Sequence, residues 1–544
     1  MIRRLAVSNV RLFDGQLWEF LLRPLTVFCG TNSSGKSTIL RTLLLLRQSH
    51  GIGEPGTTSD GRLRLVGSQV DLGNYANFVS HNNSDLDVGI GIAVDGTLSA
   101  GALRDLYLQS TGKQPAKRLK GLDDGDMATC ENGCMLWFGV GAEGEHESDG
   151  ASEPVKPRTA TEPDLTLRQA YLKSGGYQIS HGGTALLTWL ANATREQVRT
   201  GVCTLRMPVS YFDRIGGYEL LEVVRPDQGD LQDMLCVLSG LFPCNIFARS
   251  KQWESEDGIR SEEGGGEPKW GFIPLPPALD RSLEAIQNAL RSIHYLSPLR
   301  SPSKRYYMAP AEAAPGLDPA GDFLPYMLSH MDECLVTNHT PLPGGTTTES
   351  TLMAALNEWL AYLRTGEYRP NTHGEIKASS HLHVLVEVAL KTVNGAEMHS
   401  LADSGFGYSQ VLPILVRTLM ANPGETVIVE QPELHLNPAL QVRLAEFFTC
   451  MARAGKQLLI ETHSEHIVNA IRVMVAEDET AGTDDMCAVY YFDCHHGGLK
   501  VHELHVQPDG SVPEWPTHFF GEAVDLTGRL LRAQKHCRDT KRGR

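Results

Sequence analysis

The fold of this chain is decided by the stretch Gly30-Thr31-Asn32-Ser33-Ser34-Gly35-Lys36-Ser37, which matches the phosphate-binding pattern GxxxxGK[ST] at every fixed position. An apolar run precedes it and an apolar-periodic segment, 36–47, follows it, so the pattern predicts strand, glycine-rich turn and helix. In such a turn backbone amides surround phosphates, Lys36 contacts the β- and γ-phosphates, and the Ser37 hydroxyl binds Mg²⁺. The expected phosphate-site residues are Gly30, Asn32, Ser33, Ser34, Gly35, Lys36, Ser37 and Thr38.

A second apolar strand, 426–429, ends in the acid Glu430, followed by Gln431, Pro432 and Glu433. An acid at this position can hold the water shell of Mg²⁺, although aspartate is more usual there. Gln431 stands where a hydrolytic carboxylate is expected, and an amide can orient water but cannot accept its proton. The general base is therefore Glu433, another residue or the phosphate itself, and we expect slow hydrolysis. A helix cap beginning at Asn437 is the alternative explanation for part of this cluster.

Two further segments favour the same chemistry. The strand 457–460 leads to His463, which can contact a γ-phosphate; alone it is an ordinary histidine, but it follows Glu430 by 33 residues (463 − 430). The segment 401–410 places Ser404, Gly405 and Gly407 directly before a predicted helix, which makes an anion-binding helix N-terminus. Taken alone, this second segment would be a capped turn.

Together the four pieces resemble the ATP-binding-cassette head of the SMC-like DNA-repair and OLD ATPases. The resemblance implies that ATP and Mg²⁺ are the cofactors and that the signature segment of one subunit completes the ATP site of another. The family's site residues fall on Lys36 and Ser37 (Walker A), Glu430 and Gln431 (Walker B acid and catalytic glutamate), Asn437 (D-loop), His463 (switch histidine), and Ser404 to Gly407 (signature). Gln48 and Gln69 both compete for the metal-binding Q-loop role, and Gln69 has the more loop-like setting.

A narrower resemblance rests on the segments 295–300, 403–413, 430–438 and 515–520, and covers about residues 1–80 and 290–525. These segments look like bacterial AAA-type ATPases of phage-defence operons, nearest to Septu and retron ATPases of the PtuA kind. The resemblance implies a homodimer or higher oligomer through the heads, a separate HNH-type nuclease as effector, and a nucleic-acid component of the defence system. OLD relatives carry a nuclease domain after the switch histidine. We do not expect one here, because 81 residues (544 − 463) follow His463 without an Asp-x-Asp pair in an apolar strand.

The expected fold class is α/β, with a nucleotide-binding core split along the chain. Residues 1–100 form a β-rich N-terminal lobe with the phosphate loop, and 101–290 an inserted, largely helical middle region. The helix-like spacing lies in 183–198 and 232–241, and mobile loops are expected at 141–163 and 254–267. Residues 291–480 form the C-terminal lobe, and 481–544 a strand and aromatic segment with a basic tail. No heptad array predicts a long coiled coil.

Composition limits the remaining function classes. The chain has 544 residues, 41% hydrophobic and 21% charged, with a net charge of −16. A nucleic-acid contact therefore needs a local basic patch, and 529–544 offers seven Lys/Arg against one acid, as solubilising tails also do. The scattered cysteines and the N-terminus without a signal-peptide pattern predict a cytoplasmic protein, and no apolar run is long enough to span a membrane.

Two rival functions stay open. In the first, the chain itself is a nuclease that acts through the middle region or through a His-rich hairpin. The hairpin contains Cys494, His495, His496, His502 and His505. Alternatively, the chain clamps DNA between its heads and the basic tail. The leading prediction is an ATPase that controls a partner effector in anti-phage defence.

Overall fold

The computed structural model of the chain describes the larger part of the 544 residues, and the description below is confined to them. The described residues are 1–50, 61–111, 123, 125–140, 170–181, 184–193, 197, 202–208, 218–220, 231–250, 270–275, 277–308, 319–322, 324–341, 345–381, 385–391, 397–403, 406–478, 482–495, 498–513, 515 and 528–534. The predicted loops 141–163 and 254–267 lie outside them, as do Ser404, Gly405, residues 516–520 and the tail after residue 534.

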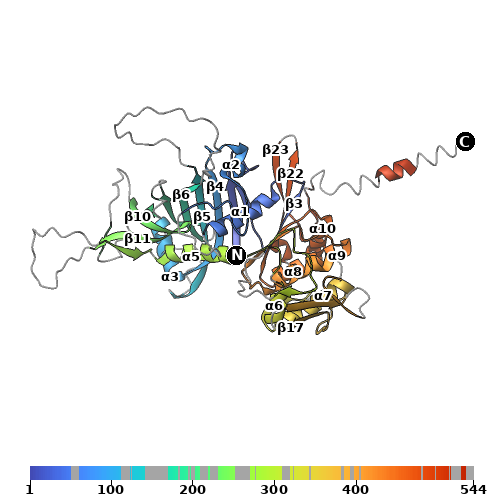
Figure 1. Cartoon of the computed structure of the whole chain (residues 1–544). Helices are drawn as coiled ribbons and strands as arrows, with labels where there is room; N and C mark the ends of the chain where they lie inside the picture. Colours follow the sequence, from blue (N-terminus) through green and yellow to red (C-terminus); the bar gives the residue numbers. More distant parts are fainter. Residues whose placement is uncertain are drawn as a thin grey trace, which may run out of the picture. The chain divides into compact units, whose positions relative to one another are not determined.

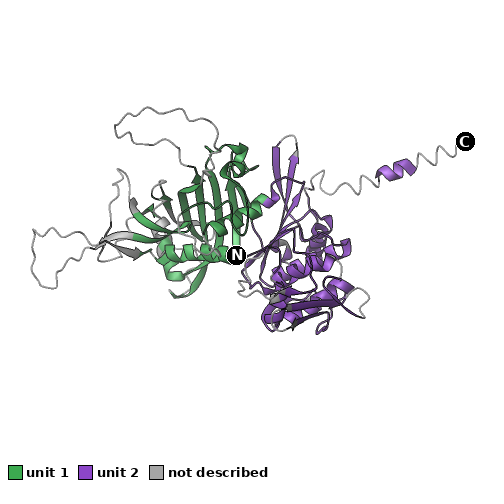
Figure 2. Ribbon diagram, in the orientation of Figure 1, with its two compact units in different colours: residues 1–21, 38–293 green, residues 22–37, 294–544 purple. Residues whose placement is uncertain are grey.

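The chain forms two compact units, each built from two stretches of sequence (Figure 2). The first comprises Met1–Leu21 and Thr38–Ile293, and the second comprises Leu22–Ser37 and His294–Arg544. The phosphate loop, 30–37, thus belongs to the unit formed mainly by the C-terminal half of the chain.

The first unit is built on one eleven-stranded sheet of order β12-β11-β10-β8-β7-β6-β5-β4-β1-β2, with β9 paired to β11. Its described strands pair antiparallel, and the long pair β4–β5 runs in register from Val88↔Phe138 to Ser99↔Met127. Burial alternates along β5, as expected for a sheet with two different faces. The strands are β1 (Ile2–Ser8), β2 (Trp18–Leu21), β4 (Val88–Ser99), β5 (Met127–Gly139), β6 (Tyr171–His181), β7 (Thr184–Asn192), β8 (Val202–Pro208), β9 (Tyr218–Leu220), β10 (Leu231–Ser239), β11 (Phe242–Ser250) and β12 (Trp270–Pro274).

Few of the described residues of this unit lie in helices. α5 (Pro277–Arg291) packs against β4 and β5 (Figure 1), because Leu279, Leu283, Ile286 and Leu290 recur on one helix face and are buried. The others are α1 (Lys36–Ser49), which begins in the second unit, α2 (Tyr75–Phe78), the 3₁₀ turn η1 (Ser80–Asn82) and α3 (Ala100–Thr111).

The expectation of a largely helical middle region is wrong. The described residues between 127 and 274 lie mostly in strands, and the two segments with helix-like spacing, 183–198 and 232–241, contain β7 and β10. Short apolar runs fit both periods, so pairing with neighbouring strands decides between them. In β10, Cys236 and Leu238 are buried while Val237 between them is partly exposed, which is the two-residue period of a strand.

The second unit contains a six-stranded sheet of order β13-β20-β21-β3-β22-β23. β20, β21, β3 and β22 are parallel neighbours, and every residue of β20 and β21 is buried, as in sheets covered on both faces. The phosphate-loop strand β3 thus lies between strands from the C-terminal half, and the predicted α/β class is confirmed. The strands are β13 (Ile293–Leu296), β20 (Thr426–Glu430), β21 (Gln457–Glu461), β3 (Leu25–Gly30), β22 (Cys487–His495) and β23 (Gly498–Leu504).

Helices and two small sheets complete this unit. The helices are α6 (Leu324–His330), α7 (Leu352–Thr365), α8 (Phe406–Met420), α9 (Pro438–Arg453), α10 (Glu465–Ala476) and α11 (Thr483–Met486). The small sheets contain β14 (Tyr307–Met308), β17 (Ile376–His381), β18 (Leu385–Lys391) and β19 (Met398–Ser400), and β15 (Leu335–His339) with β16 (Thr347–Thr351). Among the described helices none is longer than the 16 residues of α9, and none has the length and apolar character needed to cross a membrane.

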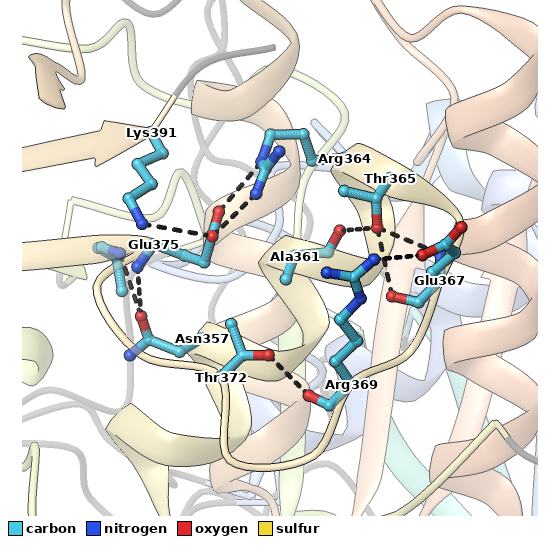
Figure 3. A network of polar contacts seen from close by, with 10 residues as sticks. Asn357, Ala361, Arg364, Thr365, Glu367, Arg369, Thr372, Glu375 and Lys391 are labelled. Atoms are coloured by element: carbon cyan, nitrogen blue, oxygen red, sulfur yellow. Dashed lines mark hydrogen bonds and ion pairs between the residues drawn. The ribbon is translucent and has the colours of Figure 1, made fainter. Parts of the chain in front are cut away.

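A polar network holds the loop after α7 in place (Figure 3). Glu375, whose side chain is 6% exposed, accepts two hydrogen bonds from Arg364, at 3.1 and 2.8 Å, and has Lys391 Nζ at 3.8 Å. Asn357 Oδ1 accepts from the backbone N–H groups of Glu375 and Ile376. Since the carboxylate is paired and hydrogen-bonded, its burial is compensated.

A buried lysine binds the C-terminal end of helix α8. Lys456 is 0% exposed, and its ammonium donates to the carbonyls of Thr418, at 3.0 Å, and Leu419, at 2.7 Å. These carbonyls lie in the last turn of α8, where a cation is favoured by the helix dipole. Burial lowers the pKa of Lys456 to about 7, against the opposing effect of Glu425.

Candidate nucleotide-binding site

The phosphate loop follows β3 and is shaped by positive φ angles at Gly30 (+132°), Ser33 (+59°) and Gly35 (+95°). At Gly30 a side chain is excluded, since a Cβ atom would lie 2.1 Å from the carbonyl oxygen of Phe492 in β22. That same carbonyl accepts the N–H of Thr31 at 3.0 Å. The loop is therefore seated directly on the backbone of β22.

Lys36 is folded back over the loop. Its ammonium donates to the carbonyls of Thr31, at 2.6 Å, and Gly30, at 3.2 Å, and the residue is 3% exposed. Burial lowers its pKa; Glu461 opposes this shift most, followed by Cys29 and Glu433. The Lys36 ammonium thus lies at the loop. The two carbonyl oxygens that accept its hydrogen bonds can be replaced by phosphate oxygens.

The other predicted loop residues are placed as follows. Asn32 and Ser33 are exposed, Ser34 is buried and donates from its hydroxyl to Thr31 O at 2.8 Å, and Thr38 is buried and accepts from Thr42 Oγ1 at 2.7 Å.

Two carboxylates stand side by side where β20 and β21 end, because Glu430 and Glu461 are register partners in the parallel pair. Both are buried, at 1% and 3% exposure. Glu430 Oε1 accepts from the Tyr295 hydroxyl at 2.9 Å, whereas Glu461 Oε1 accepts from the Ser37 hydroxyl at 2.8 Å. The acid that meets the predicted Mg²⁺-binding serine is thus Glu461.

Gln431 and Glu433 form the turn out of β20. Gln431 has φ +46°, and its N–H donates to Glu461 O at 2.7 Å. Glu433 accepts from the Thr462 hydroxyl at 2.8 Å with one oxygen and from the backbone N–H of His463 at 2.7 Å with the other. Burial raises the pKa of Glu433, and these hydrogen bonds and Arg300 oppose the shift.

His463 lies against the phosphate loop. Burial and the nearby Lys36 lower its pKa, and a hydrogen bond with the backbone of Gly30 opposes the shift. The preceding residue, Thr462, donates its N–H to Phe28 O in β3 at 3.0 Å. The structure therefore brings the predicted switch histidine to the predicted phosphate site.

Arg300 is a buried cation of this cluster that residue patterns did not identify. It is 6% exposed and donates from Nη2 to Glu430 O at 3.0 Å. Burial lowers its pKa to about 10, with Glu433, Tyr295 and Glu430 opposing, so it is charged at neutral pH. Among the described residues, its Nε and Nη1 have no hydrogen-bond partner.

Other predicted residues lie elsewhere. Asn437 caps α9 by accepting from Leu440 N at 3.0 Å, as the alternative capping explanation expected. Gly407 is in the first turn of α8, where a Cβ atom would meet Leu436 Cδ2 at 3.6 Å and His435 O at 3.5 Å. Of the signature, Ser404 and Gly405 lie outside the described residues.

The two candidate Q-loop residues belong to the first unit. Gln48 is committed to backbone groups of Arg64 and Val70, and Gln69 Oε1 accepts from Arg47 Nη1 at 3.0 Å.

The donor set of the second unit fits ATP and Mg²⁺. Lys36 and the loop amides suit phosphates, and the Ser37 hydroxyl with the carboxylates of Glu430 and Glu461 offers the oxygen ligands that Mg²⁺ prefers. Within the described part of the chain, no three His, Cys, Asp or Glu side chains are grouped to hold a metal unaided. Nucleotide oxygens would therefore complete the coordination of an ion at this site.

Two family models match parts of the chain. Residues 386–469, from β18 into α10, match the family model described as "AAA domain, putative AbiEii toxin, Type IV TA system". The matched stretch contains Glu430, Glu461 and His463. Residues 483–530 match a protein family of unknown function, DUF3696.

Three solved structures of SMC heads are similar to this chain over 93% of its length. They are an SMC head bound to the C-terminal winged-helix domain of ScpA (TM-score 0.35, 11% identity, 98% of that chain), the SMC head from Thermotoga maritima (0.32, 8%, 99%), and an SMC head with an extended coiled coil bound to the C-terminal domain of ScpA derived from Pyrococcus furiosus (0.33, 10%, 96%). At these TM-scores the likeness carries no functional conclusion. No curated protein matches the chain.

Proposed function

We propose that this protein binds ATP with Mg²⁺ at the loop 30–37 and hydrolyses it slowly. The observation that carries the proposal is the meeting of Lys36, Ser37, Glu461 and His463 at one edge of the parallel sheet. Loop amides and Lys36 bind the phosphates, Ser37 with Glu430 holds the ion, and His463 stands beside the loop as a contact for the γ-phosphate. Mg²⁺, when bound, neutralises charge on the phosphates.

Two residues support slow turnover, Gln431 and Glu433. By the family resemblance they lie near the water that attacks the γ-phosphate. Gln431 cannot accept a proton. Glu433 can, but both of its oxygens already accept hydrogen bonds from the segment 462–463. Glu433 therefore acts as a positioning residue for the switch histidine, and Gln431 orients water.

We further propose that two heads close around two nucleotides, with Ser404, Gly405, Gly407 and Asn437 of one copy facing the phosphates bound by the other. The position of Gly407 in the first turn of α8 supports this arrangement, because N–H groups there lack partners within the helix. Gln69 is our candidate for the Q-loop, since both polar atoms of the Gln48 amide are engaged by backbone.

The biological role we propose is control of a separate effector, an HNH-type nuclease, in anti-phage defence, with nucleic acid as a component of the system. The matched family description names a toxin of a toxin–antitoxin system, which supports a role in defence. Copurification of the effector with the chain from its own operon tests this part. Recovery of the chain without a nuclease would contradict it.

Calorimetry tests the nucleotide part. Nucleotide-free protein should bind ATP with Mg²⁺, and Lys36→Ala should lose this binding while remaining folded. A folded wild-type chain that binds no ATP refutes the proposal.

Mixing two defective chains tests the paired heads. Lys36→Ala and Gly407→Arg are each expected to be inactive, but a mixed dimer has one site free of both changes. Mixing should therefore restore up to half of the wild-type hydrolysis per dimer. Absence of any restoration, when sedimentation shows mixed dimers, contradicts the shared site.

A further inference from the structure

Glu461 is a buried acid that lies closer to the phosphate loop than the predicted Walker B acid does. Its strand, β21, is inserted between β20, which ends in Glu430, and β3, which leads into the loop. Glu461 therefore receives the Ser37 hydroxyl at 2.8 Å, while Glu430 receives the Tyr295 hydroxyl from the neighbouring strand β13.

The electrostatic effects on Lys36 agree that Glu461 lies closer to the phosphate loop than Glu430 does. The acid that most raises the pKa of Lys36 is Glu461, with Glu433 contributing less. Glu461 thus interacts with both chemically active residues of the loop, Lys36 and Ser37. A carboxylate that is 3% exposed and reaches both of these groups is placed where the triphosphate and its ion bind.

We propose that Glu461 is a third protein ligand group for the Mg²⁺ of bound ATP, beside Ser37 and Glu430, and that its charge makes ATP binding depend on that ion. The proposal rests on the function proposed above. Mg²⁺ commonly joins one or two carboxylates to the phosphates of a nucleotide, directly or through water. The ligand class is a divalent cation carried by a nucleoside triphosphate.

The charge of Glu461 has opposite effects on the two forms of the nucleotide. Without Mg²⁺, the buried carboxylate repels the triphosphate, and in a buried setting such repulsion is strong. With Mg²⁺, the same carboxylate attracts the ion. The affinity gain that Mg²⁺ brings therefore contains both effects.

Glu461→Gln tests this by binding rather than by turnover, since glutamine keeps an oxygen that can accept from Ser37. We expect the variant to bind metal-free ATP, measured in EDTA, more tightly than wild type, and ATP with Mg²⁺ more weakly. The affinity gain caused by Mg²⁺ should fall by about tenfold or more, equivalent to about 1.4 kcal/mol. Glu461→Asp keeps the charge and should keep the weak binding of metal-free ATP.

Glu425→Gln is the matched control, because it makes the same change at the opposite end of strand β20 from Glu430. There Glu425 pairs with His294 at 2.9 Å. The control should leave both affinities unchanged. If Glu461→Gln weakens both affinities equally, or changes neither, the proposed role is wrong. A wild-type chain that binds no ATP in either condition refutes the proposed function itself, and this inference with it.

Discussion

The carboxylate of Glu433 accepts a hydrogen bond from the backbone N–H of His463, with 2.7 Å between Oε1 and the nitrogen. The turn after β20 and the turn after β21 are thereby connected across 30 residues of sequence. Because His463 also contacts the backbone of Gly30, this bond links the turn 431–433 to the phosphate loop. The following predictions concern this cluster and the groups that support it.

Gln431→Glu should raise the rate of ATP hydrolysis, because it introduces a proton acceptor where the wild type has an amide. General bases typically contribute about 10²- to 10⁴-fold, so an increase of about tenfold or more is expected. The measurement is phosphate release at saturating ATP, with ATP affinity as the control. An unchanged or lower rate in a folded variant would mean that Glu433 or the phosphate accepts the proton in the wild type.

Gly30→Ala should abolish ATP binding. The added Cβ meets the Phe492 carbonyl at 2.1 Å, and the φ of +132° is itself unfavourable for alanine. Gly424→Ala is the control for alanine at a positive φ outside the phosphate loop, since Gly424 has φ +92° with no atom within 4 Å of an added Cβ. Calorimetry should show normal ATP binding in the control variant; equal loss in both variants would contradict the steric explanation.

Arg300→Met should lower the free energy of unfolding by about 1–3 kcal/mol, because it leaves the buried carbonyl of Glu430 without its donor and removes a positive charge that interacts with Glu430 and Glu433. Urea denaturation measures this change. Arg300→Lys keeps the charge but cannot reproduce the planar guanidinium contact with Glu430 O, so we expect an intermediate loss. A loss below about 1 kcal/mol in Arg300→Met would show that the cation is dispensable.

Lys456 should make stability depend on pH. Its folded-state pKa, about 7, lies below the usual lysine value, so from pH 7 upward the unfolded chain binds more protons and stability rises with pH. Relative to Lys456→Met, wild type should gain up to about 1.4 kcal/mol per pH unit between pH 7 and 9. Urea denaturation at pH 7, 8 and 9 measures the difference; a constant difference would mean that Lys456 is charged throughout this range.

Sequence patterns predicted those candidate residues whose position depends on a single strand and the turn after it. Lys36, Glu430 and His463 each follow an apolar strand, and parallel strands bring such positions to one edge of a sheet. Glu461 ends a strand in the same way, but its contact with Ser37 depends on β21 lying between β20 and β3. Strand order is set by packing and is not visible in the local pattern.

Arg300 and the middle region were missed for related reasons. The burial of Arg300 and its contact with Glu430 arise from tertiary packing. The two residues are 130 positions apart, so the local sequence around Arg300 does not predict the contact. In 183–198 and 232–241 the apolar residues satisfy helix and strand periods alike. Pairing with the extensive sheet of the first unit decides for strands, and that pairing is again non-local.

The seat of the phosphate loop on β22 has a consequence for synthesis of the protein. The carbonyl of Phe492 that excludes a side chain at Gly30 also binds the N–H of Thr31, yet more than 450 residues separate the two ends of this contact. A ribosome has to add more than 450 residues after the loop before β22 is available to support it. The emerging chain therefore acquires this support for the loop only after β22 has been synthesised, and shorter nascent chains lack it.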